Sequence, residues 1–182
     1  TEVELKGWAI ECRIYAEDPF RSFLPSTGRL RTYKPPLNRS EDKLVIRNDS
    51  GVNEGGEISM FYDPMISKLC AWGETRDISI KRMESALDNF LLEGIDHNIP
   101  FLSAILGSKR FKSADLSTSF IQEEYEEGFQ GIIPNNQEEW TLGTISLAYH
   151  ITEILKDFDS LEGFSEEWQV HINYKSCLLY TS

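Results

Sequence analysis

An arginine at position 13 is the side chain of this 182-residue chain that is best suited to chemistry. It lies in an alternating segment, Gly7-Trp-Ala-Ile-Glu-Cys-Arg-Ile-Tyr15. An arginine keeps its charge at any working pH and presents a fixed fork of donors, so it cannot act as a general base but can stabilise an oxyanion. The alternative is a strand arginine that forms an ion pair with Glu11 or Glu17. The pattern alone favours the ion pair.

A carboxylate at Asp63 is the second candidate, because it follows Tyr62 and precedes Pro64. The residue before a proline is held in an extended or turn conformation. At a break between two strands this carboxylate could orient Arg13 as a supporting partner. It could equally close an Asx turn by accepting hydrogen bonds from its own backbone. The sequence leaves both interpretations open.

The sequence lacks the motifs of several other kinds of site. Its glycines at 51, 55 and 56 are without the Lys and Ser/Thr of a phosphate-binding loop. The three histidines are scattered, without the spacing of metal ligands. The odd count of three cysteines, with no C-x-x-C pair, indicates a reducing compartment. We therefore expect no metal site and no cofactor-binding residues within this chain.

Acidic residues outnumber basic ones, and the excess is unevenly distributed. The net formal charge is −12. Residues 1–112 hold 16 basic and 17 acidic side chains, a net of −1, whereas residues 113–182 hold 2 and 13, a net of −11. We expect no nucleic-acid partner, which would need a positive surface, and no membrane role, because no apolar run is long enough to span a bilayer. The shift near Ser113 suggests a change of module.

Residue periodicity predicts a series of strands followed by helices. In a first strand at residues 7–17, the apolar face consists of Trp8, Ile10, Cys12 and Ile14, and the polar face of Glu11, Arg13 and Tyr15. Further strands are expected at residues 30–33, 43–47, 58–62 and 66–72. The first strand would then present Arg13 on a polar face that looks into a cleft.

Helices are expected to follow these strands. One begins at Thr75 as its N-cap and ends at Gly94, which would be its C′ residue. A second covers residues 100–106 and is capped by Asn98, and a third, short one begins around Thr118 and ends before Gly128. Residues 137–158 are apolar almost all the way round, which is typical of a helix buried on every side. A strand is expected to begin at Trp168.

Several segments of the chain resemble one known family. They are Gly7–Pro19 with Phe23–Arg29, Tyr62–Leu69, and Ala86–Phe90 followed by Gly94 and His97–Pro100. Together they are similar to the C-terminal subdomain of the biotin carboxylase module in acyl-CoA carboxylase α subunits, most of all those of the propionyl-CoA carboxylases. The resemblance covers residues 3–130 strongly and residues 131–174 weakly.

The resemblance implies two domains. Residues 1–130 would be the biotin carboxylase C-terminal subdomain, an α+β fold with a small antiparallel sheet and packed helices. Residues 131–182 would be the incomplete start of a linker module in which a β-barrel wraps a long helix. Only that helix and the first barrel strand would be present, and residues 176–182 do not match the family. The implied partners are the carboxyltransferase β subunit and a biotin carrier domain, in a hetero-oligomer of the bacterial cytoplasm or the mitochondrial matrix. Thr1 would be an internal position of the parent protein.

The resemblance also implies a reaction, in which ATP activates bicarbonate and biotin is carboxylated at a ureido nitrogen. Arg13 would meet the negative charge on the ureido oxygen, with Glu11 and Asp63 in support. Arg47 aligns with an arginine at a subunit interface of bacterial relatives, although a surface ion pair is the competing interpretation. ATP with Mg²⁺ or Mn²⁺ would bind an upstream lobe, and biotin a downstream carrier domain. We therefore expect this chain to be inactive alone.

Two alternatives stay open. In the first, the parent is the α subunit of another acyl-CoA carboxylase, acting on acetyl-, methylcrotonyl- or geranyl-CoA, because the α subunit does not touch the acyl chain. In the second, the chain is an assembly module without a catalytic role, which an Arg13 buried in an ion pair with no open cleft beside it would favour.

Overall fold

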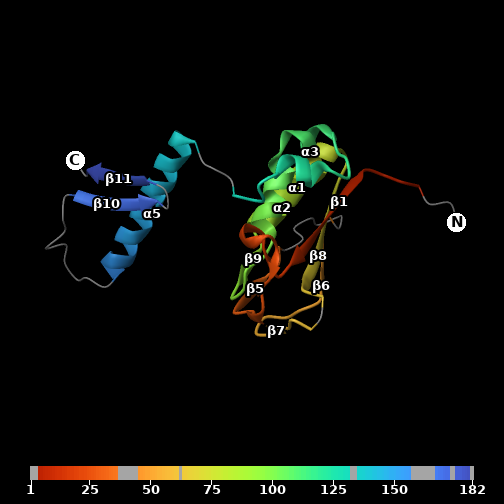
Figure 1. Cartoon of the computed structure of the whole chain (residues 1–182), viewed down its shortest axis with the longest axis horizontal. Helices are drawn as coiled ribbons and strands as arrows, with labels where there is room; N and C mark the ends of the chain where they lie inside the picture. Colours follow the sequence, from red (N-terminus) through yellow and green to blue (C-terminus); the bar gives the residue numbers. More distant parts are fainter. Residues whose placement is uncertain are drawn as a thin grey trace. The chain divides into compact units, whose positions relative to one another are not determined.

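The computed structural model divides the chain into two compact units, Thr1–Gly131 and Ile132–Ser182 (Figure 1). The structure describes residues 4–36, 45–61, 63–131, 135–156, 167–172 and 175–180, with side chains as far as residue 152. The expected strand ends at 43–44 and 62 lie outside the described residues. Each unit is considered by itself below.

A three-stranded antiparallel sheet forms the centre of the first unit. Its middle strand is β8 (Met65–Gly73), which pairs with β1 (Trp8–Tyr15) on one side and with β6 (Ile46–Ser50) on the other. Side chains alternate along β8 from Ser67 onward, with Ser67, Leu69 and Ala71 buried, whereas Ile66 before them is buried as well. This period of two gives the sheet one inner, apolar face and one outer face.

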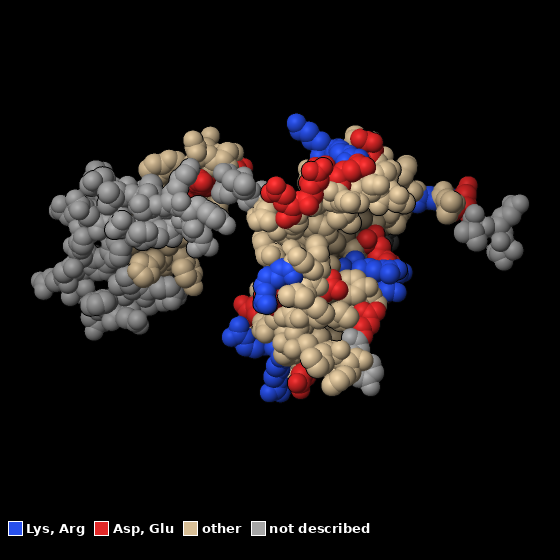
Figure 2. Space-filling model, in the orientation of Figure 1, with Lys and Arg blue, Asp and Glu red and all other residues tan. Residues whose placement is uncertain are grey.

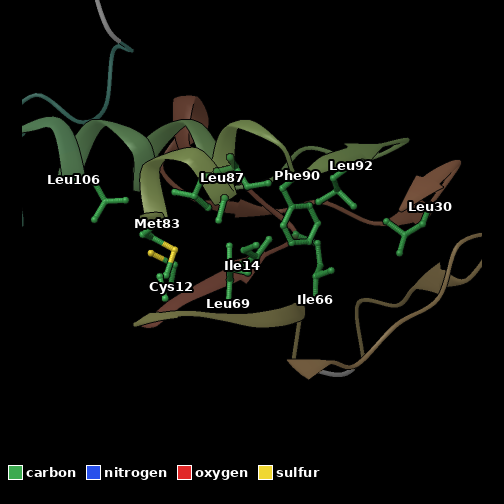
Figure 3. Packing of buried hydrophobic residues seen from close by; sticks show 14 of the residues in the cluster. Cys12, Ile14, Leu30, Ile66, Leu69, Met83, Leu87, Phe90, Leu92 and Leu106 are labelled. Carbon is green, nitrogen blue, oxygen red and sulfur yellow. The ribbon is translucent and has the colours of Figure 1, made fainter. Parts of the chain in front are cut away.

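Helix α1 (Arg76–Asp88) covers the inner face of the sheet (Figure 3). Thr75 caps its first turn as predicted, because the threonine side chain accepts a hydrogen bond from the Ile78 N–H. On the apolar side of this helix, Met83 lies over Cys12, and Leu87 points into the cluster that contains Leu69 (Figure 3). Burial of these side chains, together with that of the strand residues below them, supplies the main stabilisation of the unit.

Shorter elements surround this core. The 3₁₀ turn η1 (Pro19–Arg21) follows β2 (Glu17–Asp18), which pairs with β3 (Leu24–Pro25). Two further pairs join β4 (Gly28–Arg29) to β7 (Glu57–Ile58) and β5 (Thr32–Lys34) to β9 (Leu91–Glu93). Helix α2 (Ile99–Gly107) packs against α1 and is followed by α3 (Lys109–Ser113) and α4 (Phe120–Glu124).

Ion pairs connect the two short helices at the end of the first unit. Arg110 of α3 lies 2.8 Å from Glu123 and 3.8 Å from Glu124 of α4, and 3.5 Å from Asp115. Figure 2 shows acidic and basic side chains interleaved over the end of the unit that carries α3. The acidic excess of this region is therefore partly balanced within the unit by Arg110.

The structure corrects three expectations from the sequence. Helix α1 ends at Asp88, so Gly94 is not its C′ residue: it follows β9 at φ +110°, where a Cβ would collide with the Arg29 carbonyl oxygen. The strand expected at residues 58–62 is shorter, because only Glu57–Ile58 finds a partner strand. Trp8 is 56% exposed although it was expected on the apolar face, because it pairs with Gly73 at the end of the sheet.

The second unit contains a long helix, α5 (Asn136–Lys156), and an antiparallel hairpin of β10 (Glu167–Ile172) and β11 (Lys175–Tyr180). The helix and the strand β10 were expected, whereas β11 was not. On α5, Leu147 and Ile151 are half-buried, but Leu142, Ile145 and Tyr149 on the opposite side are 50%, 59% and 69% exposed. One side of this helix is thus covered and the other is open.

No helix in the described ranges combines the length and apolarity needed to cross a membrane.

Candidate functional site

The outer face of the central sheet brings together most of the residues that the sequence singled out. The strand register sets Arg13 of β1 beside Lys68 of β8, which in turn lies beside Asp49 of β6. A second row, two residues along, places Glu11 beside Cys70 and Cys70 beside Arg47. Directly opposed residues in a sheet have Cβ atoms about 5 Å apart. Charged groups from three separate segments therefore share one small surface.

Arg13 projects from the polar face of β1, as the alternation predicted. Its side chain is 59% exposed, and its Nε donates to Oε1 of Glu11 at 3.1 Å. The hydrogen bond to Glu11, followed by one to the Tyr15 side chain, raises the pKa of the Arg13 guanidinium. The site thus offers a permanently charged, solvent-accessible donor fork that Glu11 holds from the same strand.

Tyr15 is a member of this site that the sequence analysis placed on the right face but did not single out. It lies two residues beyond Arg13 on β1, at the point where the pairing with β8 shifts register between Ile14 and Tyr15. Such irregularities bend a strand and re-aim its side chains. Alternation was the signal that could have identified Tyr15, because it shares the polar face with Glu11 and Arg13.

Asp63 occupies the position of an Asx turn. Its Oδ1 accepts a hydrogen bond from the Met65 N–H at 2.9 Å, which is the bond that the turn interpretation requires. Its charge also acts on Glu17, whose pKa is raised first by burial and then by Asp63. Among the described residues the side-chain partners of Arg13 are Glu11 and Tyr15, so a supporting role for Asp63 toward Arg13 stays a prediction.

Arg47 forms a surface ion pair, as the competing interpretation anticipated. Its Nη2 lies 3.0 Å from Oδ2 of Asp49 and 3.9 Å from the sulfur of Cys70. Burial raises the pKa of the Cys70 thiol, although Arg47 opposes that effect. On the inner face, burial raises the pKa of Cys12 to about 12. Both thiols therefore stay protonated near neutral pH and are poor nucleophiles.

A hollow of about 980 Å³ lies on a different part of the first unit, between α1 and β6. Ile46, Ile78 and Arg82 are among its lining residues, and Arg13 is not. Arg13 therefore lies on an open sheet face and not within this hollow. Among the described residues there is no group of three or more side chains able to hold a metal ion.

Asn98 reaches the same strand from the start of α2. Its Oδ1 accepts from the Tyr15 N–H at 2.9 Å, and its Nδ2 donates to the Arg13 carbonyl oxygen at 3.1 Å. The sequence analysis assigned this side chain to the N-cap of α2, but it makes no capping hydrogen bond there. No local sequence pattern identifies the contact, because 83 and 85 residues separate Asn98 from its two partners.

A family model and individual relatives of known name point to the same family of proteins. The family described as "Biotin carboxylase C-terminal domain" matches residues 11–123. The propionyl-CoA carboxylase alpha chain of Ruegeria pomeroyi is 47% identical over 169 residues, which are 84% of this chain and 25% of that protein. The mitochondrial propionyl-CoA carboxylase alpha chain of Homo sapiens is 47% identical over 131 residues, 71% of this chain and 17% of that protein.

Solved structures agree with these relatives. The biotin carboxylase subunit of pyruvate carboxylase superposes with a TM-score of 0.62 at 37% identity, over 67% of this chain and 26% of that one. The likeness confirms a small α+β domain with antiparallel sheets. The chain spans about a quarter or less of the length of the curated relatives cited here.

Proposed function

This chain belongs to the family of biotin carboxylase C-terminal domains, and we propose that it serves as that part of a propionyl-CoA carboxylase α subunit. The parent protein would carboxylate biotin with bicarbonate at the expense of ATP. The support for propionyl-CoA is the 47% identity to the alpha chains from a bacterium and from a mitochondrion. Acetyl-, methylcrotonyl- or geranyl-CoA enzymes are the alternative parents.

The role of Arg13 in this reaction follows from its charge and its exposure. Biotin, when bound, supplies a ureido nitrogen that accepts the carboxyl group. Removal of the proton from that nitrogen would leave negative charge on the ureido oxygen, and the Arg13 guanidinium offers N–H donors at an accessible sheet face that could meet this charge. Preorganised donors of this kind contribute strongly to stabilising developing oxyanions. Glu11 holds the Arg13 guanidinium in place through a hydrogen bond, so we assign it a supporting role.

The other components of the reaction would come from outside this chain. ATP and its Mg²⁺ or Mn²⁺ would bind a separate lobe of the parent protein. Biotin would arrive on a carrier domain. The chain by itself would then be inactive. The two types of relative suggest a bacterial cytoplasm or a mitochondrial matrix as the site of the parent enzyme.

The second unit would be the beginning of the linker module that contacts the carboxyltransferase β subunit. The open side of α5, with Leu142, Ile145 and Tyr149, supports this proposal. An apolar helix face with several large exposed side chains is typical of a segment that another surface covers. The division at Gly131 is compatible with the proposed domains 1–130 and 131–182.

One observation favours a second function, that of an assembly module without a catalytic role. Arg13 does form an ion pair with Glu11, and Arg47 forms another with Asp49. The pair at Arg13 is open to solvent and not buried, however, and an exposed arginine remains available to a ligand. The catalytic proposal therefore accounts better for the exposure of this side chain.

The test is the exchange of Arg13 in the full-length α subunit that contains this segment. Arg13→Ala should lower biotin-dependent ATP cleavage by about 10²-fold or more, as loss of one oxyanion donor does. Arg47→Ala is the matched control, since it removes another exposed, ion-paired arginine from the same sheet face. If Arg13→Ala and Arg47→Ala are equally active, the assembly module is the better account.

A further inference from the structure

Asn98 makes three hydrogen bonds to a single stretch of β1. Its Oδ1 accepts from the Tyr15 N–H at 2.9 Å, its Nδ2 donates to the Arg13 carbonyl at 3.1 Å, and its backbone N–H donates to the Tyr15 carbonyl at 3.2 Å. The side chain is largely buried, at 7% exposure. An amide is well suited to this place, because it offers one acceptor and one donor side by side.

These bonds lie along the edge of β1 that faces away from β8, and no other strand of the described residues pairs with that edge. The opposite edge of β1 pairs with β8, and that pairing shifts register between Ile14 and Tyr15. Ladder bonds are disrupted at such an irregularity, and the strand bends there. Asn98 satisfies the backbone groups of Arg13 and Tyr15 on the free edge, and so acts in place of a neighbouring strand where β1 is least regular.

Holding β1 takes Asn98 away from its ordinary role. It occupies the N-cap position of α2, where an asparagine side chain usually accepts from the first turn, yet it makes no such bond. Its backbone carbonyl still accepts from the Leu102 N–H at 3.0 Å, so the helix starts normally. The side chain is committed to the strand and not to the helix.

The same contacts connect Asn98 to the guanidinium of Arg13. Both backbone hydrogen-bonding groups of Tyr15 are bound to Asn98, and the Tyr15 side chain is the second of two partners that raise the pKa of Arg13. The carbonyl of Arg13 itself is the third contact. A shift of β1 at this point would therefore move Arg13 and one of its two side-chain partners together.

We propose that Asn98 is a positioning residue for Arg13, which it holds in register by bonding the free edge of β1 from the start of α2. The proposal rests on the function proposed above for Arg13, but the contact itself can be tested without any activity. Asn98 does not touch the reacting groups. Its part is to fix the backbone from which Arg13 and Tyr15 project.

The direct test uses nitrogen-15 NMR of the 182-residue chain and follows the Nε–H signal of Arg13, which is bonded to Glu11. Asn98→Ala should shift this signal and speed its exchange with water. Asn89→Ala is the matched control, because Asn89 also bonds a backbone carbonyl, that of Ser85 at 2.7 Å, at the far end of α1. The control should leave the Arg13 signal in place.

Asn98→Asp provides a second variant with an internal rescue. Its carboxylate can still accept from Tyr15 but cannot donate to the Arg13 carbonyl. Burial raises the pKa of an introduced carboxyl group, and the protonated form regains a donor. The Arg13 signal of this variant should therefore approach that of the unaltered chain as the pH is lowered. Asp96, His97 and Glu11 also titrate close to this site. The same titration of the unaltered chain measures their effect on the Arg13 signal, and this effect is then subtracted.

Kinetics of the full-length subunit complete the test. Asn98→Ala should lower kcat for biotin carboxylation by about tenfold to a hundredfold with little change in KM for ATP, because misplacement of a catalytic group by about 1 Å has effects of this size. An unchanged Arg13 signal in Asn98→Ala, with only a lower Tm, would overturn the positioning role. A shifted signal together with full activity of Arg13→Ala would instead refute the proposed function and leave the contact standing.

Discussion

The Nε of Arg13 lies 3.1 Å from Oε1 of Glu11, two residues earlier on the same face of β1. Neither side chain is buried, since 59% and 41% of their surfaces remain exposed. The pair therefore orients a charged group without hiding it. This combination, an arginine held in place but open to a ligand, is what the proposed role in biotin carboxylation requires.

Exchange of Glu11 should affect activity more than stability. Glu11→Gln removes the charge that holds Arg13, while exposed ion pairs contribute little to folding. We expect the Tm of the full-length subunit to stay the same and kcat for biotin carboxylation to fall by less than about tenfold. Asp49→Asn, which breaks the Arg47 pair, is the control and should leave kcat unchanged. If Glu11→Gln and Asp49→Asn have equal kcat values, Glu11 has no supporting role in the reaction.

The buried thiol of Cys12 should resist modification in the folded chain. Its pKa is raised from 9.0 to about 12 by burial, so almost no thiolate forms at pH 8. A disulfide reagent added to a Cys70→Ser, Cys177→Ser variant should react only at the rate of global unfolding. Fast reaction without denaturant would show that the inner face of the sheet is accessible.

The same shift predicts how stability depends on alkaline pH. Because the folded pKa lies above the unfolded one, the contribution of Cys12 is fully present below pH 9.0 and is lost as the pH rises toward about 12. Urea unfolding across this range should show a steeper loss of stability for the unaltered chain than for Cys12→Ala. Parallel curves for the two proteins would contradict the raised pKa.

Truncation of the core should be far more costly than truncation of the surface. Leu69 is fully buried on the inner face of β8, so Leu69→Ala should reduce the free energy of unfolding by about 2–5 kcal/mol. The control is Leu116→Ala, because Leu116 is 47% exposed, and it should change the free energy of unfolding little. Urea denaturation of each variant measures the difference. A loss below about 1 kcal/mol at Leu69 would place the core elsewhere.

The open side of α5 should promote self-association of this chain. Ile145 and Tyr149 are 59% and 69% exposed, and large apolar side chains that stay wet favour aggregation or a partner. The double variant Ile145→Gln, Tyr149→Gln should remain monomeric at higher concentration, with unchanged helix content by circular dichroism. A substitution of the half-buried Leu147 should instead lower the helix content. A monomeric unaltered chain with slow hydrogen exchange across residues 142–155 would show that the second unit is self-sufficient.

The chain should bind no ATP, because its glycines lack the residues of a phosphate-binding loop. Calorimetry with Mg-ATP is expected to give no saturable heat. The full-length subunit serves as the positive control. A micromolar affinity of the 182-residue chain would mean that a nucleotide site lies within it.

Much of the first unit could be predicted from local patterns. The alternation along residues 8–15 placed Arg13 on the outer face, and Thr75 marked the start of α1, because side-chain periodicity and capping depend on residues close together in the chain. The long helix α5 was also evident from its composition. By contrast, the third predicted helix was too long, because the structure has only the shorter α4 between residues 118 and 128, and α3 was not predicted.

Only the tertiary structure decided what surrounds Arg13. The order β1-β8-β6 brings Arg47 and Asp49 onto the face that carries Glu11 and Arg13, although nothing in the local sequence specifies that order. Asn98 shows the physical reason most clearly. The local sequence predicts that Asn98 caps a helix. In the structure its side-chain amide instead hydrogen-bonds to the backbone of β1 at the irregular end of that strand. Buried backbone groups must find partners, and which partner they find depends on residues that folding brings close from far along the chain.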